Sequence, residues 1–68
     1  MPTAITHRQQ VTALADALTK AYYFGGSLQR AAHEAANAER FELTDDLWES
    51  AHDILWVRVE ADRSFRQD

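Results

Sequence analysis

Helix-breaking residues are almost absent from this chain, and this constrains its fold more than any other feature. The single proline is Pro2, and the only two glycines are the adjacent pair Gly25-Gly26. A chain of 68 residues with so few turn residues has little means of reversing direction between short strands. The sequence therefore predicts an all-α fold whose main break lies at the glycine pair.

Before the glycine pair, apolar residues recur at spacings of three and four, which places them on one stripe of a helix. Thr6 and Gln9 are spaced as a capping box, and Gly25-Gly26 supplies a stop. We predict a helix over about residues 6–24, with one helix continuing through the glycines as the alternative. The stripe consists of Val11, Leu14, Ala15, Leu18, Ala21 and Tyr22.

A second helix is predicted over about residues 27–40, with Ser27 as its N-cap. Small residues dominate its inner face, so it buries little area and depends on its neighbours for stability. A short link of residues 41–43 follows it. The predicted inner face consists of Leu28, Ala31, Ala32, Ala35 and Ala38.

The third helix, over about residues 45–65, has the best-marked start. Thr44 is placed to cap it, and Leu43 and Trp48 have the spacing of a hydrophobic staple. Residues 54–59 are also rich in strand formers, but no second strand-like run could pair with them. Arg58 and Asp62 fall within the apolar face, spaced as an i, i+4 pair. That face is predicted to hold Leu47, Trp48, Ala51, Ile54, Leu55 and Phe65.

The three helices predict one small bundle formed by a single domain, residues 1–68, in which we find no internal repeat. Because 12 of the residues are alanine, few side chains can fill a core. The chain has no cysteine, so disulfides cannot reinforce it. Small domains often compensate by self-association, and we therefore expect a homodimer.

The formal net charge of −4 is concentrated in one part of the chain. Residues 39–53 carry six carboxylates against Arg40 alone. An acidic patch of this kind repels phosphate and could attract a basic protein surface, the alternative being the solvated start of a helix. We take the patch to be Glu42, Asp45, Asp46 and Glu49.

Several large side chains do not fit the predicted core. On a helical wheel Trp56 lies off the core face, Tyr23 lies outside the first stripe, and Phe24 enters the glycine turn. Aromatic residues and arginine commonly anchor protein interfaces, although packing at helix ends could also absorb these rings. The predicted interface residues are Tyr23, Phe24, His52, Trp56, Val59 and Arg63.

Other classes of function find little support. No glycine-rich phosphate loop and no recognisable nucleophile, base and carboxylate set occur, so we expect neither an enzyme nor a small-molecule substrate. Glu49 and His52 form only one copy of a Glu-x-x-His pattern, and Asn37 stands where a zincin helix needs its second histidine. We therefore expect no metal or cofactor. No apolar run spans a membrane and the N-terminus lacks a signal pattern, which favours the cytoplasm.

The main alternative function is a small helix-turn-helix-like regulator that binds DNA. The outer face of the second predicted helix could hold Arg30, His33, Asn37 and Arg40, which include base-reading types of side chain. Glu34 and Glu39 on the same helix and an isoelectric point near 5.2 disfavour binding to phosphates.

Two stretches, residues 22–30 (YYFGGSLQR) and 48–56 (WESAHDILW), together with the length, acidity and helical character of the chain, resemble a known group of proteins. These are the short acidic proteins that Pseudomonas phages make against their hosts, in particular the quorum-sensing anti-activators. The resemblance implies a dimeric, non-enzymatic inhibitor acting in the bacterial cytoplasm. It also implies two host partners, a LuxR-type transcription activator and the ATPase of type IV pilus assembly.

Overall fold

The computed structural model describes residues 6–66, which form three α-helices and no strand. They are α1 (His7–Phe24), α2 (Leu28–Glu39) and α3 (Asp45–Arg66), as the sequence predicts. The alternative of one helix through the glycines is wrong, because Gly25 ends α1 with a left-handed backbone at φ 78°. Helix α3 runs through residues 54–59, so the choice of a helix over a strand there is confirmed. No helix within residues 6–66 has the length and apolarity needed to cross a membrane.

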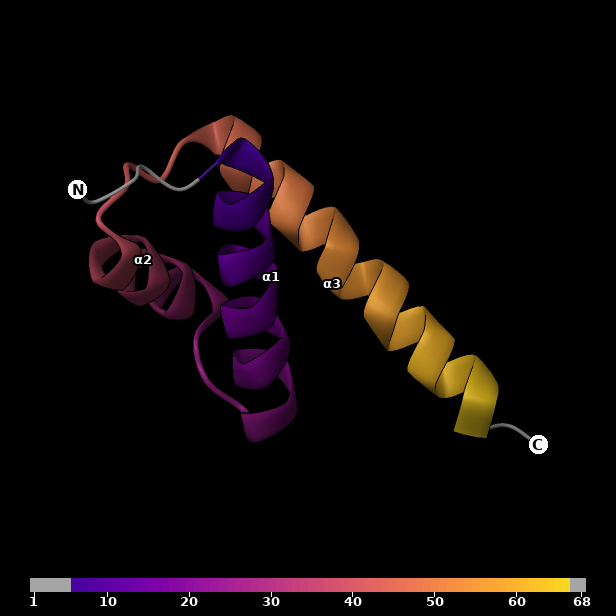
Figure 1. Cartoon of the computed structure of the whole chain (residues 1–68). Helices are drawn as coiled ribbons and strands as arrows, with labels where there is room; N and C mark the ends of the chain where they lie inside the picture. Colours follow the sequence, from indigo (N-terminus) through magenta and orange to yellow (C-terminus); the bar gives the residue numbers. More distant parts are fainter. Residues whose placement is uncertain (1–5, 67–68) are drawn as a thin grey trace.

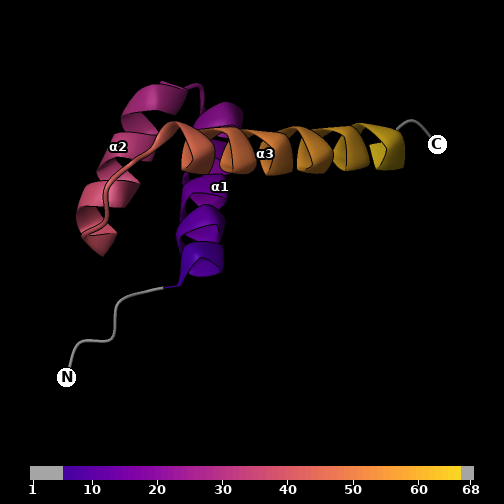
Figure 2. The same cartoon turned by 90° about the horizontal axis from the view of Figure 1, so that it is seen from above.

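The helix α1 is the centre of the bundle, because it packs against both α2 and α3. In Figure 1, α2 and α3 lie on different sides of α1. Seen from above in Figure 2, α3 crosses α1 and its C-terminal half projects beyond the other two helices. The molecule is accordingly elongated, with extents of 48 × 21 × 21 Å.

Side-chain caps fix where each helix begins. The Thr6 hydroxyl accepts from the Gln9 N–H while the Gln9 side chain accepts from the Thr6 N–H, so the predicted capping box is confirmed. The hydroxyl of Ser27 accepts from the Arg30 N–H at 3.3 Å. That of Thr44 accepts from the Leu47 N–H at 3.2 Å. All three caps satisfy N–H groups that a helix start leaves without a partner.

The end of α2 is less usual, because its left-handed position is occupied by Arg40 rather than glycine. Arg40 has φ 59° and ψ 48°. Its N–H donates to the carbonyls of Ala36 and Asn37, and the next N–H, from Phe41, donates to Ala36 at 3.0 Å. This hydrogen-bond pattern is a Schellman motif, which turns the chain so that Phe41 packs against the core.

The core is a single cluster to which all three helices contribute. Leu43, Trp48 and Ile54 are partly buried and pack against it. The cluster consists of Val11, Leu14, Ala15, Leu18, Ala32, Leu47, Ala51, Leu55 and Val59.

Four predictions of burial are wrong. On α2 the residues that are buried are Ala32, as predicted, and Ala36, which was not predicted, whereas Ala38 is exposed, because α2 turns its Ala32/Ala36 side toward α1. Phe65 is 84% exposed because it lies on the projecting half of α3, beyond the reach of α1 and α2. Tyr22 lies at the edge of the α1–α3 contact and is 40% exposed.

Polar contacts also join α1 to α3. Arg58 donates to the Asp16 carboxylate at 2.9 Å and to the Thr19 hydroxyl at 3.2 Å. The Tyr23 hydroxyl donates to Asp62 at 3.2 Å. Arg58 and Asp62 therefore both bond to side chains of α1.

Candidate protein interface

Five rings from α1 and α3 form a continuous row on the surface, which we call the aromatic cluster. Its members are Tyr22 and Tyr23 of α1 and Trp48, His52 and Trp56 of α3. Tyr22 contacts Tyr23 edge to face at a centroid distance of 5.2 Å and Trp56 at 5.8 Å. His52 contacts Trp56 edge to face and stacks on Trp48, in both cases at 5.6 Å. The row links the C-terminal end of α1 to the first three turns of α3.

The side chains of the aromatic cluster are partly exposed to solvent. Tyr23 and Trp56 are 48% and 43% exposed, and His52 is half-buried. The indole N–H of Trp56 lies 3.1 and 3.2 Å from the two ring nitrogens of His52. Because ring contacts and hydrogen bonds already fix the orientation of the rings, little side-chain entropy remains to be lost when a partner covers them.

The structure brings together three of the six predicted interface residues, Tyr23, His52 and Trp56. Arg63 is exposed on α3, two turns beyond Trp56. Phe24 is 82% exposed but lies on a shallow groove between α1 and α2, apart from the aromatic cluster. Val59 is 3% exposed and belongs to the core, so its assignment to the interface is wrong.

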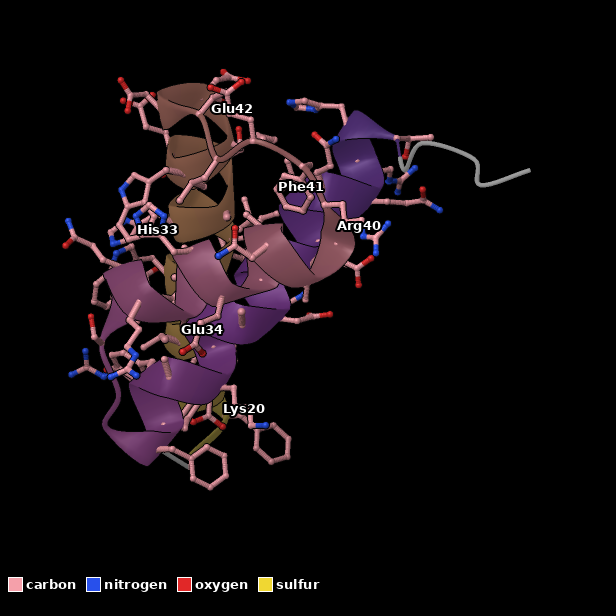
Figure 3. The ribbon with its side chains drawn as sticks, turned by 90° about the vertical axis from the view of Figure 1, so that its left-hand side faces the viewer. Lys20, His33, Glu34, Arg40, Phe41 and Glu42 are labelled. Carbon is pink, nitrogen blue, oxygen red and sulfur yellow. The ribbon has the colours of Figure 1, made fainter. Side chains whose placement is uncertain are left out.

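The four residues of the predicted acidic patch are all exposed. Asp45, Asp46 and Glu49 lie in the first two turns of α3, and Figure 3 shows Glu42 on the link just before them. Asp46 contacts His7 of α1 at 3.2 Å. Asp45 and Glu49 make no ion pair with any side chain of residues 6–66. The unpaired carboxylates of the patch, Asp45 and Glu49, therefore lie on the side of α3 next to Trp48 and His52.

A four-residue pattern organises this part of α3, so the statement that the chain holds no internal repeat is wrong for this segment. Residues 45–56 read DDLW, ESAH and DILW, three consecutive groups of the form acid, any residue, Leu or Ala, ring. The third positions, Leu47, Ala51 and Leu55, are buried, and the row continues to Val59. The fourth positions are the three α3 rings of the aromatic cluster. The first positions are Asp45, Glu49 and Asp53, all exposed.

Each of these rows therefore repeats every four residues, or about 6 Å along the helix. Residues four apart lie on nearly the same side of a helix, so each position of the pattern forms its own row along α3. The core row, the ring row and the carboxylate row therefore run side by side. Asp53, which we did not include in the acidic patch, completes the carboxylate row.

The residues on which the DNA-binding alternative depends do not share one helical face. Arg40 has left the helix at its left-handed cap, and Figure 3 shows it at the end of α2, away from His33. Arg30 is paired with Glu34 at 3.2 Å. The cations available on this side of the molecule are thus fewer than a helical wheel suggests.

Known proteins give no direct guide to this surface. Comparison with family models, with curated proteins and with solved structures finds no match to the chain. Among residues 6–66, no three histidine or carboxylate side chains are grouped closely enough to hold a metal ion.

Proposed function

We propose that this chain is a non-enzymatic binding protein that inhibits a partner by covering part of the partner's surface with the aromatic cluster. The observation that carries the proposal is the row of five contacting rings that stays half exposed on a domain with a small core. Large aromatic side chains supply most of the affinity at protein interfaces, because they fill desolvated pockets at low entropic cost. Rings in fixed orientations are suited to that role.

The charge around the aromatic cluster supports a basic target surface. Asp45, Glu49 and Asp53 line the ring row and have no ion-pair partner within residues 6–66. Charges at the rim of an interface mainly raise the rate of association. The resemblance to phage anti-activators makes a host regulatory protein of the bacterial cytoplasm the first partner to test, either a LuxR-type activator or the pilus assembly ATPase.

We also propose that two copies of the chain associate through the projecting half of α3. Val57, Ala61 and Phe65 are spaced four apart there and are exposed, with Val57 at 67% and Phe65 at 84%. Five of the eleven buried hydrophobic residues in the described chain are alanines, so the monomer buries few large side chains. Pairing of the projecting segments would cover the exposed stripe and leave the aromatic cluster free.

The experiment is affinity capture with the purified LuxR-type activator and the purified ATPase, using the parent chain and two variants. Trp56→Ala and Tyr23→Ala should each weaken capture at least tenfold, a loss of about 1.4 kcal/mol or more that is typical of interface anchors. Phe24→Ala is the matched control, since it removes an exposed ring that lies outside both the aromatic cluster and the proposed dimer stripe. Circular dichroism establishes that each variant is folded. Equal capture by all variants, or no capture by the parent chain, would refute the proposal.

A further inference from the structure

We infer that the segment recognised by the aromatic cluster is a basic helix with arginines at positions i, i+4 and i+8. This inference rests on the proposed function and deepens it by giving the chemistry of the partner. It follows from the juxtaposition of a ring row and a carboxylate row with the same spacing on α3.

The two rows are in register. Asp45, Glu49 and Asp53 each precede by three residues a ring of the aromatic cluster, Trp48, His52 and Trp56 respectively. Residues three apart are neighbours on a helix surface, so each of the three α3 rings has a carboxylate beside it. Glu60 lies four residues after Trp56, so it adds a carboxylate at the C-terminal end of the ring row.

The three carboxylates of the carboxylate row, and Glu60 beyond them, are free to bind a cation. Elsewhere in the described chain Asp16, Glu34 and Asp46 are engaged with Arg58, Arg30 and His7. No such partner exists within residues 6–66 for Asp45, Glu49, Asp53 or Glu60. Arg63 follows Glu60 by three residues and makes no ion pair within residues 6–66. The surface therefore combines aromatic faces with four uncompensated negative charges.

Arginine fits this combination better than other side chains. Its planar guanidinium can stack on an aromatic face and at the same time pair with a carboxylate through two N–H groups. Lysine makes the charge contact but is more strongly hydrated and does not stack as a plane. A neutral apolar segment would leave the carboxylates beside the rings without a partner, which is costly once water is excluded.

The spacing selects the conformation of the partner. Positions four apart on a helix repeat every 6 Å, as the two rows on α3 do. Packing of the i, i+4 ridges of two helices is also the commonest class of helix contact. Arginines at i, i+4 and i+8 of a helical partner would then each meet one ring and one carboxylate.

The test uses alanine-based helical peptides that lack tryptophan, so that binding is followed by the fluorescence of Trp48 and Trp56. One peptide carries three arginines at i, i+4 and i+8, and others replace them with lysine or with neutral citrulline. A fourth carries the same arginines at i, i+2 and i+5, which spreads them around the helix. We expect the arginine peptide to bind about two- to fivefold more tightly than the lysine peptide and at least tenfold more tightly than the other two.

Variants of the chain identify the binding surface. Glu49→Gln and Asp53→Asn should each weaken the arginine peptide about two- to fivefold, the effect of one exposed charge pair. Glu39→Gln, an exposed carboxylate on α2, is the matched control and should bind as the parent does. Because these residues are exposed, the substitutions leave the core intact.

Equal binding of the arginine and citrulline peptides, equal binding of both arginine spacings, or an equal effect of Glu39→Gln and Glu49→Gln would overturn the inference. The proposed function would still stand if protein capture depended on Trp56. If protein capture did not depend on Trp56 or Tyr23, the proposed function itself would fail, whatever the peptides do.

Discussion

Arg40 and Gly25 both have a left-handed backbone, but only Arg40 has a Cβ atom. Substitutions at the two positions therefore test how far this conformation controls the stability of the chain. Arg40 has φ 59° and Gly25 has φ 78°. An L-residue in this region is strained by about 1–2 kcal/mol through the clash of its Cβ with the backbone, and glycine is not. Glycine in turn lowers stability by about 0.4–1 kcal/mol, because it gives the unfolded chain more freedom.

The net effect of Arg40→Gly is therefore a gain of about 0.5–1 kcal/mol in the free energy of unfolding. The Arg40 side chain is exposed and makes no ion pair within residues 6–66, so its removal subtracts little from this gain. For a domain of this size the melting temperature should rise by about 3–6 °C.

Gly25→Ala and Gly26→Ala should act in opposite directions, although the residues are adjacent. A Cβ at Gly25 meets nothing within 4 Å, so the expected loss of about 0.5–1 kcal/mol comes from its φ alone. A Cβ at Gly26 makes ordinary contact with the Ala21 Cβ at 3.6 Å, and φ there is not left-handed. Gly26→Ala should therefore stabilise the chain by about 0.5 kcal/mol.

Urea denaturation followed by circular dichroism at 222 nm measures all three variants on one scale. The reasoning is refuted if Arg40→Gly lowers the free energy of unfolding by more than about 0.5 kcal/mol. It is also refuted if Gly25→Ala and Gly26→Ala shift stability in the same direction. Either result would mean that the assigned turn conformations do not govern these positions.

Three further predictions concern the core, a cap and association. Leu55→Ala, at a fully buried position, should cost about 2–5 kcal/mol in urea denaturation, whereas Phe24→Ala, at a position that is 82% exposed, should change stability by less than about 0.5 kcal/mol. Thr44→Ala should cost about 1 kcal/mol in the same assay, because the Leu47 N–H loses its acceptor. The parent chain should sediment as a dimer at micromolar concentration, and Phe65→Asp should yield a folded monomer; a parent that stays monomeric would contradict the proposed pairing.

Local signals in the sequence were sufficient to predict the helices and their caps. Thr6, Ser27 and Thr44 each satisfy the N–H group three residues on, and this interaction needs no tertiary contact. The left-handed end at Gly25 follows for the same reason. Arg40 could not be found in this way, because no residue type other than glycine or asparagine signals that conformation.

Burial on α3 was predicted less well, because a helical wheel identifies faces but not where the neighbouring helices end. Phe65 lies on an extension of the core-facing side of α3, but α1 and α2 do not reach that far. Val59 was assigned to the Trp56 side, although it continues the buried row of Leu47, Ala51 and Leu55. Counting the four-residue period would have placed Val59 in the core and Asp53 in the carboxylate row.

The four-residue pattern on α3 contains positions that stabilise the fold and positions that we propose bind the partner. Substitutions at the different positions should change stability and binding to different extents. Loss of a third-position side chain such as Leu55 opens the core and unfolds the domain. Loss of a ring such as Trp56 removes a proposed contact and also the part of the indole that is already covered, so both binding and stability fall. Neutralising Glu49 or Asp53 leaves the core untouched, and rim charges act mainly on the association rate. The carboxylate row is therefore where recognition can be altered while the fold stays constant.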